Sequence, residues 1–388
     1  MDNFFDINYK SINKHNEELC GDKVEYIYDD DGCIIVISDG LGSGVKANIL
    51  ATMTTKIAVT MLKNNASIDD TIETIINTLP ECKVRKLAYS TFTIIKIDKE
   101  NNAYIAEYDN PPYFYYSHKR IIPVEKKERI IGSKKIYESN IKLDIGDTIC
   151  VVSDGAVHAG IGQLLNLGWS RDEINEYLRE LNNVNKSSQL INGNFIGVCN
   201  NLYNNEPGDD TTILTIKVRK PEVIDIFIGP PADKSLDSQL ADIMKNSDNM
   251  KIICGGTTAL IAERELDKQL EVDLDSMKDD VPPIAYMDGF DLVTEGVLTL
   301  GKALENIKSL SKSSYESVVR NNSYDGATLL TYMLTDIGTH INFYIGRAVN
   351  PAHQNPNFPM GYNIKQNIVD NLIDELKKAG KQVDVLFF

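Results

Sequence analysis

The tripeptide Ser-Asp-Gly occurs twice in this chain, each time directly after a run of apolar residues that predicts a buried strand. The first copy places Asp39 after residues 33–37, and the second places Asp154 after residues 149–152. Glycine after the aspartate lets the backbone turn sharply and approach a ligand closely. A carboxylate at a strand end is held rigidly and can still face a cleft. Asp39 and Asp154 are therefore candidate site residues.

Two more aspartates stand next to predicted strands. Asp22 ends the sequence Cys-Gly-Asp just before a strand at 23–29, and Asp209 lies in Gly-Asp-Asp just before a strand at 211–218. Each motif taken alone is typical of an ordinary turn or a solvated loop. Four carboxylates that converge at strand ends would repel one another strongly unless cations bind between them. The combination, in this order, therefore predicts a cation site.

The cysteines and histidines narrow the choice of cation. The six cysteines are widely spaced with no Cys-x-x-Cys, which indicates reduced thiols and neither a disulfide framework nor a zinc site. The five histidines form no close pair with ligand spacing. We therefore expect oxygen ligands and a hard cation such as Mg²⁺ or Mn²⁺.

The charge balance argues against several classes of partner. The chain carries 40 Lys and Arg residues against 56 Asp and Glu residues, a formal net charge of −16. Such a balance favours neither nucleic acid nor an anionic membrane as the main partner. No apolar run approaches the roughly 20 residues that cross a bilayer, and the N-terminal residues lack the pattern of a secretory signal. We expect a cytoplasmic protein.

The length of 388 residues suits two or three domains, and the pattern changes near Lys220-Pro221. Residues 1–220 are rich in strands, with two groups of helices inserted between them. The predicted strands cover 4–13, 23–29, 33–38, 90–97, 103–108, 113–118, 148–153 and 211–218, and the predicted helices cover 45–63, 68–80, 170–181 and 185–202. This order predicts an α+β domain of two stacked antiparallel sheets flanked by helices.

The first predicted helix shows a simple apolar pattern. Val45, Ile49, Met53 and Ile57 recur every four residues, which predicts one apolar face packed on the core. The helix follows directly on the first Ser-Asp-Gly loop, so a regulatory role is a second interpretation beside that of a core helix.

Residues 221–388 alternate between strands and helices. The predicted strands cover 223–228, 250–254, 284–287, 340–346 and 382–387, and the predicted helices cover 235–245, 257–267, 296–309, 325–337 and 363–379. Such alternation is typical of an open α/β sheet with a substantial parallel part.

The four acidic motifs and their order resemble the metal-dependent PP2C-like (PPM) serine/threonine protein phosphatases, in particular the SpoIIE/RsbU-type branch. The resemblance covers about residues 10–219 and is strongest in Ile-Ser-Asp-Gly-Leu-Gly-Ser-Gly at 37–44, followed by Lys46-Ala47. It implies a PP2C-like α-β-β-α sandwich for residues 1–220. The α/β open-sheet domain of residues 221–388 would follow it.

By this resemblance, the site would hold two Mn²⁺ or Mg²⁺ ions. Asp39 would bridge both ions, the carbonyl of Gly40 and the carboxylate of Asp22 would complete one metal site, and Asp154 and Asp209 would hold the other. A metal-bridging hydroxide would attack phosphorus, since a bound metal lowers the pKa of water towards about 7. Asp39, Asp154 and Asp209 would be the catalytic residues. The implied reaction is hydrolysis of phosphoserine or phosphothreonine on a regulatory protein.

Two positions depart from the pattern of many eukaryotic relatives. Leu41 stands where those proteins have a histidine proposed as proton donor, and Asn16-Glu17-Glu18 occupies the stretch that carries their arginine phosphate clamp. His158, four residues after Asp154, has two interpretations. It could protonate the leaving serine oxygen, or it could be an ordinary helix or loop residue, which is the simpler interpretation.

The second half contains a candidate anion site. Gly255-Gly256-Thr257-Thr258 follows a predicted strand and begins a predicted helix, where backbone N–H groups suit a phosphate or a carboxylate. A plain tight turn explains the same residues equally well. Loops after residues 228 and 287 could line the same sheet edge, so we expect a small-molecule ligand there and a regulatory or ligand-sensing role.

Two other functions stay open beside a protein phosphatase. The first half could be a weakly active or inactive phosphatase fold, with the chain acting as a ligand-responsive sensor through its C-terminal domain. The second half could itself act on a nucleotide or a phosphorylated metabolite, although no acid/base pair stands out there. The intact acidic set favours the phosphatase.

Overall fold

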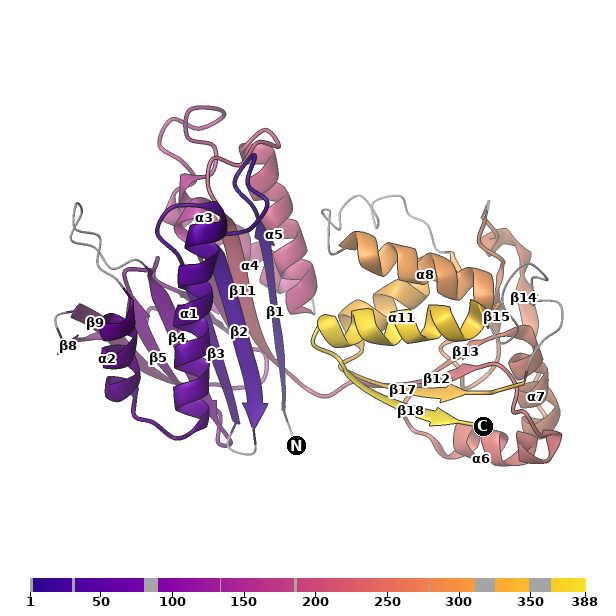
Figure 1. Ribbon diagram of the computed structural model, residues 1–388. Helices are drawn as coiled ribbons and strands as arrows, with labels where there is room; N and C mark the ends of the chain where they lie inside the picture. Colours follow the sequence, from indigo (N-terminus) through magenta and orange to yellow (C-terminus); the bar gives the residue numbers. More distant parts are fainter. Residues whose placement is uncertain are drawn as a thin grey trace. The chain divides into compact units, whose positions relative to one another are not determined.

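A computed structural model describes residues 3–29, 32–79, 90–132, 134–184, 187–278, 280–310, 325–348 and 364–388. The chain divides into two compact units (Figure 1). One unit is Phe5–Arg219, and the other is Lys220–Phe388 together with the N-terminal residues up to Phe4. Each unit is described separately below.

The first unit contains a six-stranded sheet. Its strands, in spatial order, are β2 (Asp22–Asp29), β3 (Gly32–Asp39), β4 (Phe92–Asp98), β5 (Asn102–Tyr108), β9 (Lys134–Lys142) and β8 (Lys127–Ile131). Every neighbouring pair in this sheet is antiparallel. The β2–β3 pair sets one edge of the sheet and ends at Asp22 and Asp39.

A five-stranded sheet forms the second layer of the same unit. Its strands, in spatial order, are β1 (Phe4–Ile12), β11 (Thr211–Arg219), β10 (Thr148–Val152), β6 (Phe114–Ser117) and β7 (Arg120–Ile121). The central strand β10 is antiparallel to both β11 and β6. All five residues of β10 and all nine of β11 are buried, so Asp154 and Asp209 flank the most buried strands of this sheet.

The alternation along the strands explains the layers. In β3, Ile35 and Ile37 point into the core between the two sheets, whereas Ile34 and Val36 pack under helices. Successive strand residues face opposite sides, so a strand that is apolar on both sides must be covered on both sides. The two sheets therefore share one core, and helices cover their outer faces. The predicted α-β-β-α sandwich is confirmed.

Helices of different parts of the chain cover the two outer faces. α1 (Gly44–Lys63) and α2 (Ile68–Thr78) pack on the six-stranded sheet, and α3 (Asp154–His158), α4 (Arg171–Val184) and α5 (Ser188–Leu202) belong to the five-stranded side. Ser67 and Ser187 begin α2 and α5 by accepting hydrogen bonds from backbone N–H groups of the first turn. Such caps satisfy amides that a helix leaves without partners.

The predicted apolar face of α1 is wrong for three of its four residues. Val45, Ile49 and Met53 are 59%, 52% and 39% exposed, whereas Ile57 is partly buried and packs against the core. The buried face instead carries mostly small residues: Gly44, Ala47, Leu50, Ala51, Thr54, Thr55, Ala58, Val59 and Leu62. Small side chains let the helix backbone approach the sheet closely, and this close packing decides the orientation against the more apolar stripe.

One hairpin that the sequence did not predict, β8–β9, lies at an edge of the six-stranded sheet. Four of the five residues of β8 are exposed, and charged residues are frequent in both strands, which begin with Lys-Glu-Arg and Lys-Lys. Charged edge strands discourage pairing with other chains. The same charges hide the apolar alternation by which strands are recognised.

The second unit contains a seven-stranded sheet. Its strands, in spatial order, are β14 (Glu271–Asp273), β15 (Ile284–Tyr286), β16 (Leu292–Thr294), β13 (Met250–Cys254), β12 (Val223–Ile228), β17 (His340–Ile345) and β18 (Gln382–Phe387). The five strands from β16 to β18 are parallel, and β14 and β15 add an antiparallel edge. The predicted open α/β sheet with a substantial parallel part is confirmed.

Helices cover both faces of this sheet (Figure 1). Phe227 and Ile253 pack on one face against α6 (Asp237–Asn246) and α7 (Gly256–Leu266), which lie below the sheet in this view. Residues of the other face pack against α8 (Val297–Leu310), α10 (Gly326–Tyr332) and α11 (Ile364–Lys378). Two short turns, η1 (Lys234–Leu236) and η2 (Leu274–Ser276), are 3-10 helical, and η3 (Met333–Ile337) is a π-helical extension of α10.

No helix in the described ranges is long and apolar enough to cross a membrane. Five cysteines fall within these ranges, namely Cys20, Cys33, Cys150, Cys199 and Cys254, and all five are free thiols. Cys82 lies outside the described residues.

Candidate functional site

The two Ser-Asp-Gly serines fix the ends of their strands. Ser38 and Ser153 are fully buried. The hydroxyl of Ser38 donates to the carbonyl of Thr91 at 2.7 Å and contacts the hydroxyl of Ser90. The hydroxyl of Ser153 accepts from the backbone N–H of Thr212 at 2.9 Å. Each serine therefore ties the strand end to a neighbouring segment, and the following aspartate is held in a defined position.

The two Ser-Asp-Gly glycines allow close backbone packing. A Cβ atom at Gly40 would overlap the carbonyl oxygen of Ala47 in α1, and a Cβ atom at Gly155 would overlap the carbonyl oxygen of Asp210. Neither glycine has a positive φ, so the lack of a side chain is what matters at both positions. Each glycine therefore lets another segment of the site pack against the strand end.

Asp22 and Asp39 lie opposite each other in the register of β2 and β3. Asp22 begins β2 and Asp39 ends β3, and the N–H of Gly40 continues the pairing by donating to the carbonyl of Gly21 at 3.2 Å. Asp22 is buried, with 4% of its surface exposed. The two carboxylates are therefore fixed side by side at one sheet edge.

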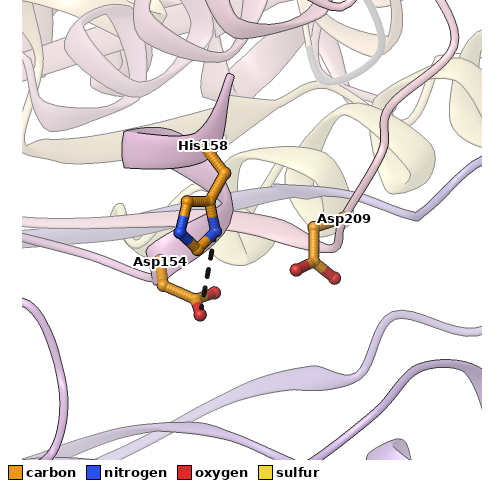
Figure 2. A group of neighbouring side chains, drawn as sticks. All are labelled: Asp154, His158 and Asp209. Carbon is orange, nitrogen blue, oxygen red and sulfur yellow. Dashed lines mark ion pairs between the residues drawn. The ribbon is translucent and has the colours of Figure 1, made fainter. Parts of the chain in front are cut away.

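Asp154 and Asp209 come together from the other sheet. One ligand atom from each of Asp154, His158 and Asp209 lies within 4.8 Å of the others. Figure 2 shows the His158 ring beside the Asp154 carboxylate, with its Nδ1 atom 4.0 Å from an oxygen of Asp154, and the Asp209 side chain approaching from a separate segment. Asp154 and His158 are four residues apart on α3, so they share one side of that short helix.

Burial and repulsion show that the two pairs form one site. Burial, together with the charges of Asp22, Asp154 and Asp209, raises the pKa of Asp39 to about 9. Burial also raises the pKa of Asp22, opposed by the Ser153 and Thr212 side chains and supported by the charges of Asp210 and Asp154, to about 7 overall. The pKa of Asp209 is raised by burial and by Asp154. The charges of the three other predicted carboxylates all act on Asp39, so Asp39 is the centre of the cluster.

Unpartnered carboxylate oxygens test whether this cluster fits a cation. Both oxygens of Asp22 and the Oδ2 atom of Asp210 are buried, and none has a partner with hydrogen-bond geometry among the described residues, although the side chains of Ser153 and Thr212 lie close enough to Asp22 to lower its pKa. Leaving buried polar atoms without partners is costly. Several such atoms beside further carboxylates fit hard divalent cations, which prefer oxygen ligands. The imidazole of His158 adds one nitrogen near the carboxylates of Asp154 and Asp209.

Two residues of this site were not singled out from the sequence. Asp210 is buried, and its Oδ1 atom accepts a hydrogen bond from the backbone N–H of Lys14 at 3.0 Å. The charge of Lys14 acts on Asp209, where it opposes the upward shift of the pKa. Lys14 follows β1, far from the acidic motifs in the sequence, so no local pattern marks it. Lys14 thus places a positive charge beside the carboxylates, and the stretch that corresponds to the arginine clamp contains Asn16-Glu17-Glu18 instead.

Glu17 organises the loop between Asp39 and α1. Its carboxylate accepts a hydrogen bond from the hydroxyl of Ser43 at 3.1 Å. A Cβ atom at Gly44, which has a φ of +66°, would overlap the same carboxylate. Glu17 belongs to Asn16-Glu17-Glu18, the stretch that corresponds to the arginine phosphate clamp of the eukaryotic relatives. The structure gives this residue contacts with the glycine-rich loop.

The predicted anion site lies in the second unit. Gly255 precedes α7, and Gly256, Thr257 and Thr258 form its first turn. Gly255 has a φ of +138°, which favours glycine. These four residues are thus separate from the carboxylate cluster, which belongs entirely to the unit Phe5–Arg219.

Comparison with known families gives one match. Residues 29–219 match the family model described as Stage II sporulation protein E (SpoIIE). Asp39, Asp154 and Asp209 lie within the matched range, and Asp22 lies before it. The search of curated proteins found no match.

Several solved structures are similar to part of the chain. The phosphatase domain of SpoIIE from Bacillus subtilis is 18% identical, with 56% of this chain and 94% of that chain covered and a TM-score of 0.43. The RsbU and RsbW domains of a Mycobacterium tuberculosis protein are 15% identical, with coverage of 62% and 68% and a TM-score of 0.45. RsbX in complex with magnesium is 18% identical, with coverage of 55% and 95% and a TM-score of 0.40.

The order of the acidic motifs, the α-β-β-α sandwich and the family match concern the same part of the chain. The match spans strands β3 to β11, and so includes both Ser-Asp-Gly motifs and the Asp-Asp pair before the last strand. Residues 29–219, just under half of the chain, therefore match the SpoIIE family, as expected from the resemblance to the SpoIIE/RsbU-type branch of the PP2C-like phosphatases.

Proposed function

We propose that this chain is a metal-dependent phosphatase that hydrolyses phosphoserine or phosphothreonine on a regulatory protein. The observation that supports it is the convergence of Asp22, Asp39, Asp154 and Asp209 from two sheets. The pKa values of Asp22, Asp39 and Asp209 are raised, and both buried oxygens of Asp22 lack partners among the described residues. Such a cluster is unfavourable by itself and becomes favourable around divalent cations.

The cluster offers two groups of ligands that share Asp39. Asp22 and the carbonyl of Gly40 would hold one ion, and Asp154 and Asp209 would hold a second, with Asp39 common to both. Two Mn²⁺ or Mg²⁺ ions so held would supply Lewis acidity for the phosphoryl group and would acidify a bound water. Phosphoryl transfer needs positioning and charge stabilisation more than a protein nucleophile. Asp39 and Asp154 would provide that positioning because buried serines fix the strand ends before them.

Two polar residues at the rim suit the rest of the reaction. The His158 side chain is half exposed and lies beside Asp154, where it could donate a proton to the leaving serine oxygen. Lys14 lies near Asp209 and could contact a phosphate oxygen. Neither role needs the histidine or the arginine of the eukaryotic pattern.

The substrate is expected to be held by contacts near the site. The net charge of −16 does not favour long-range attraction of a phosphorylated partner. Ile161, Leu164 and Leu167, in the loop after His158, are 48%, 65% and 92% exposed. An apolar surface beside the site suits a protein substrate better than a small phosphate ester.

Phosphate release from p-nitrophenyl phosphate and from a phosphoserine peptide tests the proposal. The full chain is assayed with Mn²⁺, with Mg²⁺ and with excess EDTA. The variant is Asp39→Asn, which keeps the shape of the side chain and removes its charge. Asp172→Asn on exposed α4 is the matched control.

Turnover that requires Mn²⁺ or Mg²⁺, and that falls at least about a hundredfold in Asp39→Asn only, would support the proposal. No turnover of either substrate with either metal would contradict it. Turnover that survives in Asp39→Asn would place the reaction elsewhere in the chain.

A further inference from the structure

The strand order of the second unit reverses direction at one strand, which is where open α/β sheets bind ligands. Along the parallel part, the order β16-β13-β12-β17-β18 corresponds to the chain order 3-2-1-4-5. From β12, the chain adds β13 and β16 on one side and later β17 and β18 on the other. In open α/β sheets of this kind, ligands bind outside the carboxyl ends of the strands, where the order reverses. That place here is the carboxyl end of β12 and its neighbours β13 and β17.

Three glycine backbones meet at this edge. Gly229 follows β12, Gly255 follows β13 and Gly346 follows β17. A Cβ atom at Gly255 would lie 3.7 Å from the backbone nitrogen of Gly229, and one at Gly346 would overlap the carbonyl oxygen of Gly229. Among the described residues, the side chain that reaches these loops most closely is Lys365, whose Nζ atom lies against Gly229. Backbone groups and this one amine therefore form much of the surface of the edge.

The start of α7 presents hydrogen-bond donors at the same place. Its first amides belong to Gly256, Thr257 and Thr258, and its N-cap, Gly255, has no side chain that could accept from them. Gly256 and Thr257 are exposed, and a Cβ atom at Gly256 would have no atom within 4 Å. The helix start is open, and its dipole favours a negative charge.

Thr258 gives an independent indication of a ligand. Its side chain is fully buried, and its Oγ1 atom has no hydrogen-bond partner among the described residues. This atom lies 3.5 Å from the position of a Cβ atom at Gly255, so the hydroxyl points toward the open helix start. A buried hydroxyl without a partner is destabilising, and a bound acceptor would satisfy it.

The charges at this edge include one suitable cation. The Nζ atom of Lys365, in the first turn of α11, donates to the carbonyl of Gly346 at 2.7 Å and lies against Gly229. It keeps further N–H groups for a ligand. The nearby carboxylate of Glu295 is used to begin α8, where it accepts from the N–H of Leu298 at 3.0 Å.

We propose that the second unit binds a phosphate group carried on a small molecule at this edge. The N–H groups of Gly256 and Thr257 and the hydroxyl of Thr258 would bind its oxygens, and Lys365 would balance its charge. The rest of the molecule would lie over the glycines at the ends of β12 and β17. This site is distinct from the carboxylate cluster and does not depend on the proposed phosphatase activity.

Isothermal titration calorimetry on the full chain tests this site. The probes are inorganic phosphate, pyrophosphate, AMP and ADP, in a resin-treated buffer that contains neither divalent metals nor chelators. We expect at least one probe to bind with one-to-one stoichiometry. Failure of all four probes to bind at millimolar concentration would overturn the proposal.

Matched variants at Gly256 locate the bound phosphate. Gly256→Asp introduces a negative charge into open space and should weaken binding at least about tenfold. The new carboxylate would occupy the helix start and repel the phosphate. Gly256→Asn has the same size without the charge and should change the affinity less than about threefold. Both variants should keep the melting temperature. Equal binding by Gly256→Asp and wild type would overturn the proposal.

Two further variants separate the hydroxyl from the charge. Thr258→Val should weaken binding about fivefold without lowering the melting temperature of the free protein, because it removes an unpartnered buried hydroxyl. Lys365→Met should weaken binding about tenfold, whereas Lys378→Met, at the other end of α11, should not. Binding that is lost in Asp39→Asn and kept in Lys365→Met would place the probe in the carboxylate cluster and overturn the proposal.

Discussion

Asp22 and Asp39 are direct register partners at the end of the β2–β3 pair, so two carboxylates are held opposite each other at a sheet edge. Both have a raised pKa, chiefly because burial disfavours the charged form. Like charges placed opposite each other destabilise a strand pair. A cation bound between the two carboxylates would replace this repulsion with attraction.

The first prediction concerns the stability of the metal-free protein. The pKa of Asp39 is about 9 in the folded chain against 3.8 as its ordinary value. Between these values the folded state holds a proton that the unfolded chain has released. The free energy of unfolding should therefore fall as the pH rises from about 4 to 9. Melting temperatures across this range check it.

Asp39→Asn is the control for this pH dependence, because it removes the group without changing its shape. The free energy of unfolding of Asp39→Asn should fall less steeply with pH than that of wild type. The two slopes should differ by up to about 1.4 kcal/mol per pH unit, the value for one proton. Saturating Mn²⁺ should raise the melting temperature of wild type most at high pH. Identical slopes for the variant and wild type would show that Asp39 does not bind this proton.

The second prediction separates the two adjacent aspartates before β11. Asp209 lies within ligand distance of Asp154, whereas Asp210 accepts from the N–H of Lys14, which an amide oxygen can also do. Asp209→Asn should lower Mn²⁺-dependent turnover about a hundredfold or more. Asp210→Asn should keep most activity and should raise the melting temperature of the metal-free protein near pH 7, since it removes a charge that acts on Asp22. The reverse order of activities would assign Asp210 as the ligand.

The third prediction concerns proton donation by His158. A serine oxygen needs a proton to leave, whereas p-nitrophenolate is a stable anion and needs none. His158→Gln should therefore lower kcat for a phosphoserine peptide at least about tenfold, with less than about threefold loss for p-nitrophenyl phosphate. Equal losses for both substrates would indicate a metal ligand or a structural residue, and no loss would indicate a bystander.

The fourth prediction tests the orientation of α1. Ile49 is 52% exposed and its neighbour Leu50 is 6% exposed. Leu50→Ala should cost about 2–4 kcal/mol of unfolding free energy, because it leaves a cavity in the core. Ile49→Ala should cost less than about 1 kcal/mol. Denaturant unfolding measures both, and a larger loss for Ile49→Ala would restore the face that the sequence pattern favoured.

Local pattern was enough to predict the main parts of the first unit. Alternation in β3 predicts a strand that is apolar on both sides, and such a strand needs a second sheet and helices to cover it. Ser-Asp-Gly after an apolar run predicts a carboxylate at a strand end, although the contacts that hold it, such as that of Ser153 with the N–H of Thr212, come from distant segments. The parallel sheet of the second unit followed from alternating strands and helices in the same way.

Other features depend on contacts that the chain makes over long distances. The face of α1 was decided by how closely Ala47 approaches Gly40, and a four-residue apolar repeat cannot report such a contact. The charged hairpin β8–β9 is a strand pair because β5 offers it an edge. Lys14 joins the site through a hydrogen bond to a residue 196 positions away.

The sequence by itself determined which residues can carry charge at strand ends, since strand period and turn chemistry act over a few residues. Only the tertiary structure decided that Asp22, Asp39, Asp154 and Asp209 belong to one cluster, and that Thr258 has a buried hydroxyl without a partner among the described residues. The physical reason is that burial and repulsion depend on distance in space, which local pattern does not encode.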